Sequence, residues 1–531
     1  MSQAGRPGNG VHKVNPWIIA PLVAMATFME ILDVSVANVA LQHIAGDMST
    51  SQEQSTWILT SYLVTNAVIL PLSGWFSSVL GRRRFFVFCI VGFSVSSLLC
   101  GLSTSLAMLI LFRAIQGLTG GGLQPSAQAI LVDSFPIEKR GMALAAYGMA
   151  VILAPAIGPT LGGWITDNYN WRWIFLINVP VGLILGPLIW TLVGDPEGSA
   201  ERRAALLADG LKVDYLGFSL LALGLGALQI LLDKGQEDDW FNSPFIVTLA
   251  IVSGISAISF ILWELGQDHP LVDIRLFKNR NFAACNILNF ALGFVLNSST
   301  ALLPQLVQTL FGYTATLAGE VLSPGGITLA FLMPVIGKLL SHTDARRMVV
   351  FGTVLEVTAL YLLSTQSPAT PYATFAFLRA IQAVGLGFLF LPVATLLYVG
   401  LRPQDSDQAA SISSLARNLG GSVGISVIIN AVIRDSQIQQ THLVDNITPA
   451  SSQYRHWIDT MSGVLAPHGG ADGTILTLAQ ARLYELLQSQ ASLLAYLHAH
   501  FLMALLMVVM IPLAFITKRQ PTGSKPSMAA E

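Results

Sequence analysis

The chain has 531 residues, of which 53% are hydrophobic and only 11% are charged. Soluble domains carry about 25% charged residues, so this composition excludes an ordinary soluble protein and indicates a polytopic membrane protein. The net charge of −2 gives no general attraction to nucleic acid.

Fourteen apolar segments are long enough to cross a bilayer as helices, because a hydrocarbon core of about 30 Å needs roughly 20 apolar residues. The first apolar run is too long for the core of a signal peptide and lacks a small-residue cleavage site, so we expect a retained first span. The sequence therefore predicts an all-α integral membrane protein. The predicted spans are 17–41, 57–80, 85–103, 106–132, 141–165, 173–194, 214–233, 244–264, 282–306, 316–340, 348–365, 372–400, 408–433 and 493–516.

The basic residues favour one orientation. Of the 28 Lys and Arg residues, 20 fall on the side of a fourteen-span arrangement that holds both termini, five fall on the opposite side and three lie within spans. Loops rich in Lys and Arg stay in the cytoplasm, so both termini are expected there, in a multi-pass protein of the plasma (inner) membrane. An arrangement with one or two spans fewer would scatter the basic loops over both faces.

The sequence contains an internal repeat. Arg-Ala-Ile-Gln occurs at 113–116 and again at 379–382, each time in an apolar run followed by glycine and then proline. GWFSSVLGRRR at 74–84 resembles GKLLSHTDARR at 337–347, and each copy lies two spans before its Arg-Ala-Ile-Gln span. Two related six-helix halves with an inserted helix pair are predicted, and such repeats are typical of transporters whose substrate site lies between the halves. The predicted divisions are a first bundle at 1–194, a linker with the inserted helices at 195–270, a second bundle at 271–516 and a tail at 517–531.

The external stretch from about 434 to 492 is the longest loop. Its end has apolar residues at helical spacing, which predicts that the last span extends out of the membrane as an amphipathic rod. Two interpretations remain open: the rod packs on the rim of its own protein, or it docks to a partner.

The first span carries two acids. Glu30 and Asp33 are three residues apart and share a helix face, with Asn38 expected near the same stripe. An ionisable group at the bilayer centre costs about 2.5–3.5 kcal/mol, which makes it a functional candidate by default. Two neighbouring carboxylates in a medium of low dielectric do not both ionise readily, so the pair could hold and release a proton. The alternative for Glu30 is a purely structural place nearer the membrane surface.

An arginine lies within the fourth span. Arg113 cannot lose its proton, so it needs a carboxylate or carbonyl partner, and Gln116 follows one turn later. We expect Arg113 to tune the acids of the first span, or another carboxylate, during proton exchange; the alternative is a fixed ion pair that joins two helices. Arg379 and Gln382 are the repeat copies, with a structural role favoured for Arg379.

Other polar residues within spans are candidates for a substrate cavity, with a structural role as the alternative. These candidates are Asn38, Gln116, Gln382, Arg417, Asn418 and Glu356.

The fifth span is rich in glycine and proline. Gly158, Pro159, Gly162 and Gly163 predict a bent helix with a smooth face, suited to close packing that seals one side of a cavity. Ordinary helix packing is the alternative.

The turn after the second span carries a glycine and arginine pattern. We expect it to form a cytoplasmic gating loop that grips the ends of adjacent helices, although its arginines could act only as positive anchors. Its residues are Gly74, Ser78, Gly81, Arg82 and Arg83.

Several of these stretches resemble the major facilitator superfamily, in its 14-helix drug:proton antiporter branch of the EmrB/QacA type. The likeness is carried by ILDVSVANVAL, RAIQGLTGGG, APAIGPTLGG and NWRWIFLINVPVG. It implies the major facilitator fold, a proton site at Asp33 and Arg113, and an antiporter motif in the fifth span. The long external loop is similar to the EmrB-like subgroup, which implies a periplasmic adaptor and an outer-membrane channel as partners. One departure is Ser78, where the family usually has an aspartate.

We therefore expect a proton-coupled exporter of amphipathic, apolar or cationic drugs, driven by the proton gradient without a cofactor. One alternative is a carrier of the same fold for a metabolite, siderophore or lipid, and a more distant one is a membrane scaffold or sensor that does not transport. The sequence contains no Walker glycine loop, nucleophile–base constellation or zinc-type Cys/His spacing, so we expect neither an enzyme, a metal site nor a nucleic-acid partner.

Overall fold

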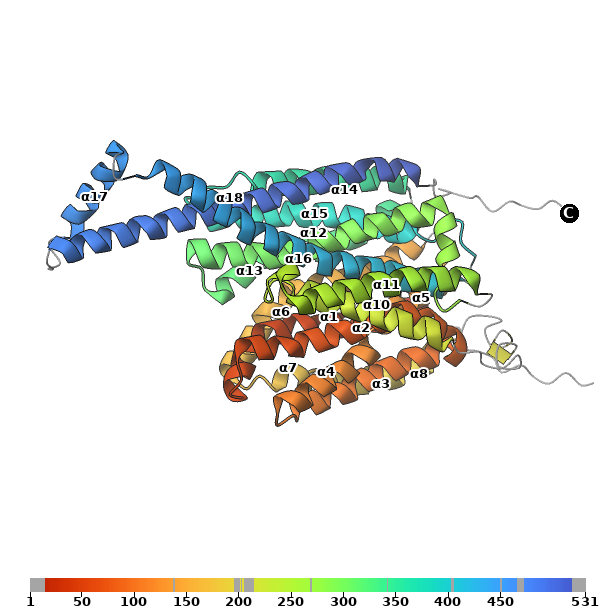
Figure 1. Cartoon of the computed structure of the whole chain (residues 1–531). Coiled ribbons are helices and arrows are strands. Elements are labelled where there is room, and N and C mark those ends of the chain that lie inside the picture. Colours follow the sequence, from red (N-terminus) through yellow and green to blue (C-terminus); the bar gives the residue numbers. More distant parts are fainter. Residues whose placement is uncertain are drawn as a thin grey trace, which may run out of the picture.

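The computed structural model shows an all-helical protein (Figure 1). The predicted tail from 518 onward and most of the linker at 195–213 lie outside the described residues. The structure describes residues 15–136, 139–194, 201, 203–204, 214–267, 270–340, 342–402, 405–448, 451–465 and 472–517.

The helices follow the predicted spans closely. The first half contains α1 (Pro16–Asp47), α2 (Gln52–Leu80), α3 (Arg82–Gly101), α4 (Leu106–Gly120), α5 (Leu123–Ser134), α6 (Arg140–Asn168), α7 (Trp173–Leu176) and α8 (Asn178–Leu192). The inserted pair is α10 (Tyr215–Lys234) and α11 (Pro244–Gly266). The second half contains α12 (Arg280–Phe311), α13 (Ala315–Leu340), α14 (Ala345–Leu363), α15 (Tyr372–Leu396), α16 (Ser406–Asn446), α17 (Ser452–Leu465) and α18 (Asp472–Ile516).

Within the described residues, twelve helices are long and apolar enough to cross a membrane, or thirteen if α6 is counted through its 45° bend after Pro155. The remaining predicted span is α14, which has 19 residues and packs against α15 and α18. Its 19 residues include three charged ones, Arg346, Arg347 and Glu356.

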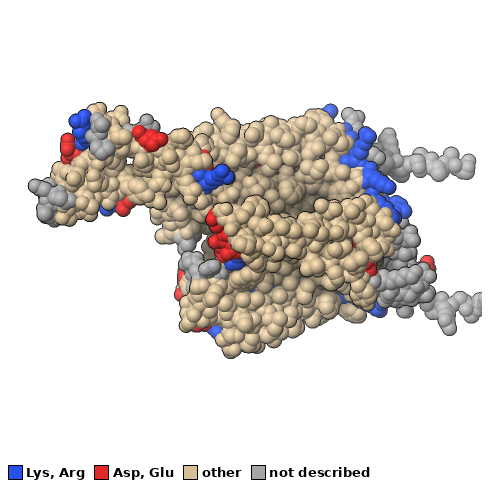
Figure 2. Space-filling view, viewed as in Figure 1, with Lys and Arg blue, Asp and Glu red and all other residues tan. Residues whose placement is uncertain are grey.

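α1 begins and α18 ends at the same end of the bundle, which we call the terminal end; the opposite end is the loop end (Figure 1). Lys and Arg side chains gather at the terminal end in the view of Figure 2. This is the end that the loop pattern assigns to the cytoplasm.

The two halves meet along α6 and α13 on one side and along α2 and α16 on the other. The inserted helix α10 packs on both α2 and α16, so it touches both halves. Thr60 of α2 donates a hydrogen bond to Asp233, and Ser426 of α16 donates one to the Leu232 carbonyl at 2.9 Å. The insert therefore covers the seam between α2 and α16.

Most of the predicted external loop is helical. α18 has 45 residues, or about 67 Å at 1.5 Å per residue, more than twice the bilayer core of about 30 Å. The stretches 434–446, 451–465 and 472–492 form a rod that projects beyond the loop end (Figure 1). Hydrogen bonds from Gln440 to Tyr484 (2.9 Å) and from Gln480 to Tyr454 (3.0 Å) hold its helices together.

Close helix crossings in the second half depend on glycine. A Cβ added to Gly293 of α12 would overlap the carbonyl oxygen of Arg417, and one added to Gly420 of α16 would overlap that of Phe290. The backbones of α12 and α16 thus touch at a point that sets the position of Arg417.

Replacing Gly293 by alanine should destabilise the fold, because the backbone carbonyl of Arg417 cannot move aside as a flexible side chain can. We expect a loss of about 1–3 kcal/mol, seen as a lower thermal unfolding midpoint in detergent. Gly254→Ala on α11 is the matched control, since nothing lies within 4 Å of its added methyl group. Equal midpoints for both variants would contradict the close crossing.

Candidate functional site

The centre of the first half is a fully buried ion pair. Asp33 lies on α1 and Arg113 on α4, and Arg113 Nη1 is 2.5 Å from Asp33 Oδ2, with neither side chain exposed. Arg113 Nε donates to the Ile58 carbonyl at 3.2 Å, and the guanidinium lies 4.4 Å from the ring centre of Tyr62. The structure thus brings together the acid and the arginine that the sequence singles out.

Two amides complete the surroundings of Asp33. Gln116 Nε2 and Asn178 Nδ2 donate to Asp33 Oδ1 at 3.1 Å and 2.7 Å, and Gln116 Oε1 accepts from Arg113 at 2.8 Å. Among the described residues, all three partners of this carboxylate are hydrogen-bond donors. Sequence reasoning missed Asn178, whose only signal is a single amide at the start of the apolar helix α8.

Glu30 has a separate set of partners. Tyr62 Oη and Asn66 Nδ2 donate to Glu30 Oε1 at 3.0 Å and 3.2 Å, and Gln124 Nε2 donates to Oε2 at 2.7 Å. Glu30 is 2% exposed, so its side chain lies inside the helix bundle. Tyr62 connects the two acids, because its ring covers Arg113 while its hydroxyl binds Glu30.

The predicted cavity residues divide into two groups. Arg417 Nη2 donates to Gln124 Oε1 and to Tyr147 Oη, both at 2.8 Å, and so reaches the first half. Asn38 is exposed and Asn418 half-buried, and neither belongs to the hydrogen-bond sets of Glu30 or Asp33 within the described part of the chain. The prediction that Asn38 lies near the helix face of Glu30 and Asp33 is wrong, because five residues of α-helix rotate Asn38 by about 140° from Asp33.

The repeat copy keeps the arginine and glutamine but not the acid. Arg379 Nη1 donates to Gln382 Oε1 at 2.6 Å and to Ser299 Oγ at 3.2 Å, and Nη2 donates to Thr300 Oγ1 at 3.0 Å. No carboxylate among the described residues lies within ion-pair distance of Arg379. Gln382 Nε2 instead donates to Glu356 of α14 at 2.8 Å, in a fully buried position.

α6 is the helix of the first half that contacts both α1 of that half and α13 of the second half. Added Cβ atoms at Gly158 and Gly162 would press on Ser35 and Val36 of α1, so these two glycines allow close packing. A Cβ added to Gly163 would have no neighbouring atom within 4 Å. The prediction that Gly163 lies on the packed face is therefore wrong, because it points away from α1 one residue after Gly162. Pro159 lies in the part of α6 that follows the bend.

The predicted gating loop joins the halves at the terminal end. Arg82 Nη1 is 2.6 Å from Asp133 of α5, and Nη2 is 2.8 Å from Asp407 of α16. A Cβ on Gly74 would come within 3.1 Å of the Gln408 backbone, so α2 and α16 are in close contact here.

The other residues of this loop have different places. Gly81 has a φ of 90°, which favours glycine, at the junction of α2 and α3. Arg83 lies 4.8 Å from the ring centre of Trp190 on α8, a helix of its own half. Ser78 is exposed and donates to the Trp75 carbonyl. The acid across the seam is Asp407 of the second half.

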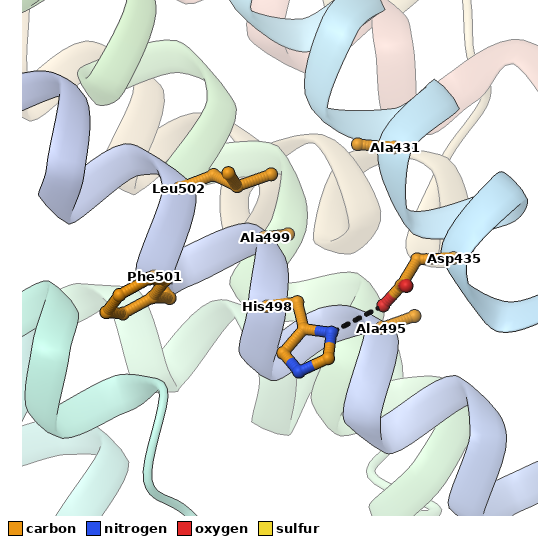
Figure 3. A pocket seen from close by; sticks show the side chains of 7 residues that line it. All are labelled: Ala431, Asp435, Ala495, His498, Ala499, Phe501 and Leu502. Carbon is orange, nitrogen blue, oxygen red and sulfur yellow. Dashed lines mark hydrogen bonds and ion pairs between the residues drawn. The ribbon is translucent and has the colours of Figure 1, made fainter. Parts of the chain in front are cut away.

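One hollow contains none of the predicted site residues. Its volume is about 260 Å³, and it lies between α16 and α18 where the rod meets the bundle (Figure 3). His498 Nδ1 and Asp435 Oδ2 pair across it at 2.7 Å. The lining residues are Ala431, Asp435, Ala495, His498, Ala499, Phe501 and Leu502.

Comparison with known proteins gives consistent matches. Residues 23–425 match the family model described as Major Facilitator Superfamily. The chain is 37% identical over 477 residues to the multidrug export protein EmrB of Escherichia coli (strain K12), covering 89% of this chain and 90% of that protein. It is 35% identical to the fatty acid resistance protein FarB of Neisseria gonorrhoeae, over 94% and 96% of the two chains. The fold is similar to that of the proton:xylose symporter XylE, with a TM-score of 0.57, 15% identity, and coverage of 94% and 96%.

Removing the Arg82 bridge should open the terminal end. In protein with Cys89, Cys100 and Cys285 replaced by alanine, we expect Arg82→Gln to speed labelling of Ser411→Cys by a water-soluble maleimide. Ser411 is fully buried against Ser73 at 2.8 Å, so labelling requires the halves to separate. Arg84→Gln is the control, because Arg84 is exposed. Unchanged labelling in Arg82→Gln would exclude a closing role for the bridge.

Proposed function

The chain belongs to the major facilitator superfamily, and we propose that it is a multidrug efflux transporter that exports amphipathic, apolar or cationic compounds in exchange for protons. The observation that carries the proposal is the buried Asp33–Arg113 pair, which places an ionisable acid between two spans. The multidrug export relative, which matches almost the whole chain, supports drugs as the cargo. In this proposal the proton gradient is the only driving force, without cofactor or enzymatic chemistry.

Asp33 is the proposed proton carrier. While it is ionised, its charge holds Arg113, Gln116 and Asn178 in place and fixes α1 to α4 and α8. A proton on Asp33 removes the charge to which these donors are directed, so the contact weakens and α1 can shift. Drug binds between the halves, and rocking of the halves exposes the site to each side in turn.

The proposed orientation puts the terminal end in the cytoplasm. There the Arg82 bridge to Asp133 and Asp407 closes the path between the halves. The proton then enters from the loop end, and the drug leaves toward the same side.

A second candidate function is export of a physiological metabolite, siderophore or lipid by the same mechanism. The fatty acid resistance relative favours a lipid-like acid within this group, at nearly the same identity as the drug exporter. Transport assays therefore need both a drug and a long-chain fatty acid.

The rod is the proposed contact for further components. It presents apolar side chains beyond the membrane, among them Val464, Leu476 and Leu486, which are 58%, 46% and 47% exposed. A periplasmic adaptor that leads to an outer-membrane channel would cover these groups.

Exchange depends on Asp33 in this proposal. In liposomes with an imposed pH gradient, Asp33→Asn should abolish gradient-driven drug accumulation, because asparagine cannot take up the proton. Asp47→Asn, at the far end of the same helix, should transport normally. Hydrogen bonds from Trp171 and Arg172 hold the pKa of Asp47 below its usual range, so it stays ionised through the exchange cycle.

The outcome distinguishes the candidate functions. Accumulation by Asp33→Asn equal to wild type rules out Asp33 as the proton carrier. Gradient-driven movement of the fatty acid but of no drug selects the second function. If folded wild-type protein moves neither the drug nor the fatty acid, the remaining candidate is a role without transport.

The rod should be needed in cells but not in liposomes. Replacing residues 451–465 by a Gly/Ser linker of equal length should leave drug:proton exchange unchanged and abolish drug resistance in a double-membraned host. The physical reason is that α17 lies outside the bundle and touches only α18 among the principal helix contacts. Resistance equal to wild type at equal expression would show that the rod recruits nothing essential.

A further inference from the structure

Arg417 is a buried cation with neutral partners. It lies on α16, is 4% exposed, and donates to Gln124 and Tyr147 of the first half. Its guanidinium carbon is 5.7 Å and 5.5 Å from the ring centres of Tyr147 and Phe390. Among the described residues no carboxylate lies within ion-pair distance. A guanidinium cannot be neutralised by losing its proton, so its charge must be balanced from further away.

Gln124 supplies that connection, and its orientation is fixed by chemistry. Arginine can only donate hydrogen bonds, so Gln124 must turn its oxygen to Arg417 and its nitrogen to Glu30. Gln124 Nε2 lies 2.7 Å from Glu30 Oε2, as this orientation requires. A directed chain of hydrogen bonds therefore runs from Arg417 through Gln124 to Glu30 and ends on an acceptor.

An ionised Glu30 suits this chain and a protonated one does not. The other oxygen of Glu30 already accepts from Tyr62 and Asn66. A proton on Glu30 Oε2 would point at the N–H group of Gln124 that now donates to this oxygen, so two hydrogen-bond donors would face each other. If Gln124 turned over to accept that proton, it would present its amide hydrogens to Arg417. A proton on Oε1 would displace the Tyr62 hydroxyl hydrogen and leave Arg417 without a balancing charge.

The other charged and titratable groups around Glu30 do not replace it. Asp33 on α1 is paired with Arg113 of α4, while Tyr62 of α2 and Tyr147 of α6 contribute hydroxyl groups and no carboxylate. α5 and α8 contribute the neutral amides of Gln124 and Asn178. The negative charge that faces Arg417 through Gln124 is that of Glu30.

We propose that Glu30, Gln124 and Arg417 form a proton-sensitive latch between the two halves. Ionised Glu30 holds the latch closed, and a proton on Glu30 releases α16 from α1 and α5. Asp33 and Glu30 thus have separate tasks: one carries the proton of exchange within the first half, and the other reports protonation to the second half. The latch rests on the proposed exchange only for the direction of the cycle, and Arg417 and Gln124 act as positioning residues.

The test measures the distance between the halves without any drug. Spin labels at Leu80→Cys on α2 and Arg402→Cys before α16 are both exposed at the terminal end. The background has alanine at Cys89, Cys100 and Cys285. Distances from double electron–electron resonance in lipid nanodiscs, from mildly alkaline to mildly acidic pH, should show a growing population of longer distances as pH falls.

The latch variants should lose this response. Glu30→Gln, Gln124→Leu and Arg417→Gln should each give the acid-like distribution at every pH, with the closed-to-open ratio at alkaline pH lowered about tenfold or more, the factor expected from loss of a charged hydrogen bond. Arg417→Lys should keep part of the response, because it retains the charge without the planar geometry. Ser426→Ala, a buried position on the same helix outside the latch, is the control and should titrate like the parent.

A parent-like titration in folded Gln124→Leu or Arg417→Gln overturns the latch. So does a parent that shows no change with pH. Retained titration with no drug exchange in liposomes would instead contradict the proposed function and leave the latch intact, so the two failures can be told apart.

Discussion

The first half is organised around one constraint: a guanidinium that cannot lose its charge, on a side chain that is fully buried. Arg113 satisfies this constraint with Asp33 from α1 and with the Ile58 carbonyl from α2. The two contacts require both helices to approach α4 closely, and Gly117 allows it, since an added Cβ there would overlap the Tyr62 carbonyl. A partner removed from such a buried pair leaves an uncompensated charge. The packing of three spans therefore depends on the charge state of a single carboxyl group.

The second half repeats the arginine and glutamine of the first half, but the partners of its arginine differ. Arg379 and Gln382 keep the spacing and the mutual hydrogen bond of Arg113 and Gln116, at 2.6 Å and 2.8 Å. Hydroxyl groups surround Arg379 where the first half has an aspartate, and the nearest acid, Glu356, is reached through Gln382. In this conformation the second half does not repeat the direct ion pair, which fits one principal proton site rather than two equivalent ones.

The sequence predicts the spans well because length and apolar composition decide them, and it places the two acids of the first span among the expected partners of Arg113 because few acids lie in apolar surroundings. It does not reveal the contact between Gln124 and Arg417, since glutamine is common and 293 positions separate the two. A sequence motif can also mislead about which helix face a residue occupies, because neighbouring residues of a helix point in different directions. Gly163 looks equivalent to Gly162 in the printed motif, yet one residue of helix turns it about 100° away.

The turn after α2 joins the halves without an acid at position 78. Arg82 binds Asp133 of α5 and Asp407 of α16, while Ser78 donates only to the carbonyl of Trp75. The attraction between the halves at this turn therefore comes from acids on α5 and α16. Their part in the turn is not visible in the local sequence, because both are distant from it along the chain.

α16 and α18 run without interruption from the membrane into the rod, so the rod cannot stay still while the second half tilts. The outer end of the rod lies tens of ångströms from the bilayer core. A tilt of the second half therefore displaces this end further than any point inside the membrane. A partner protein bound at the outer end of the rod would therefore be moved once in each transport cycle, without binding drug or protons itself.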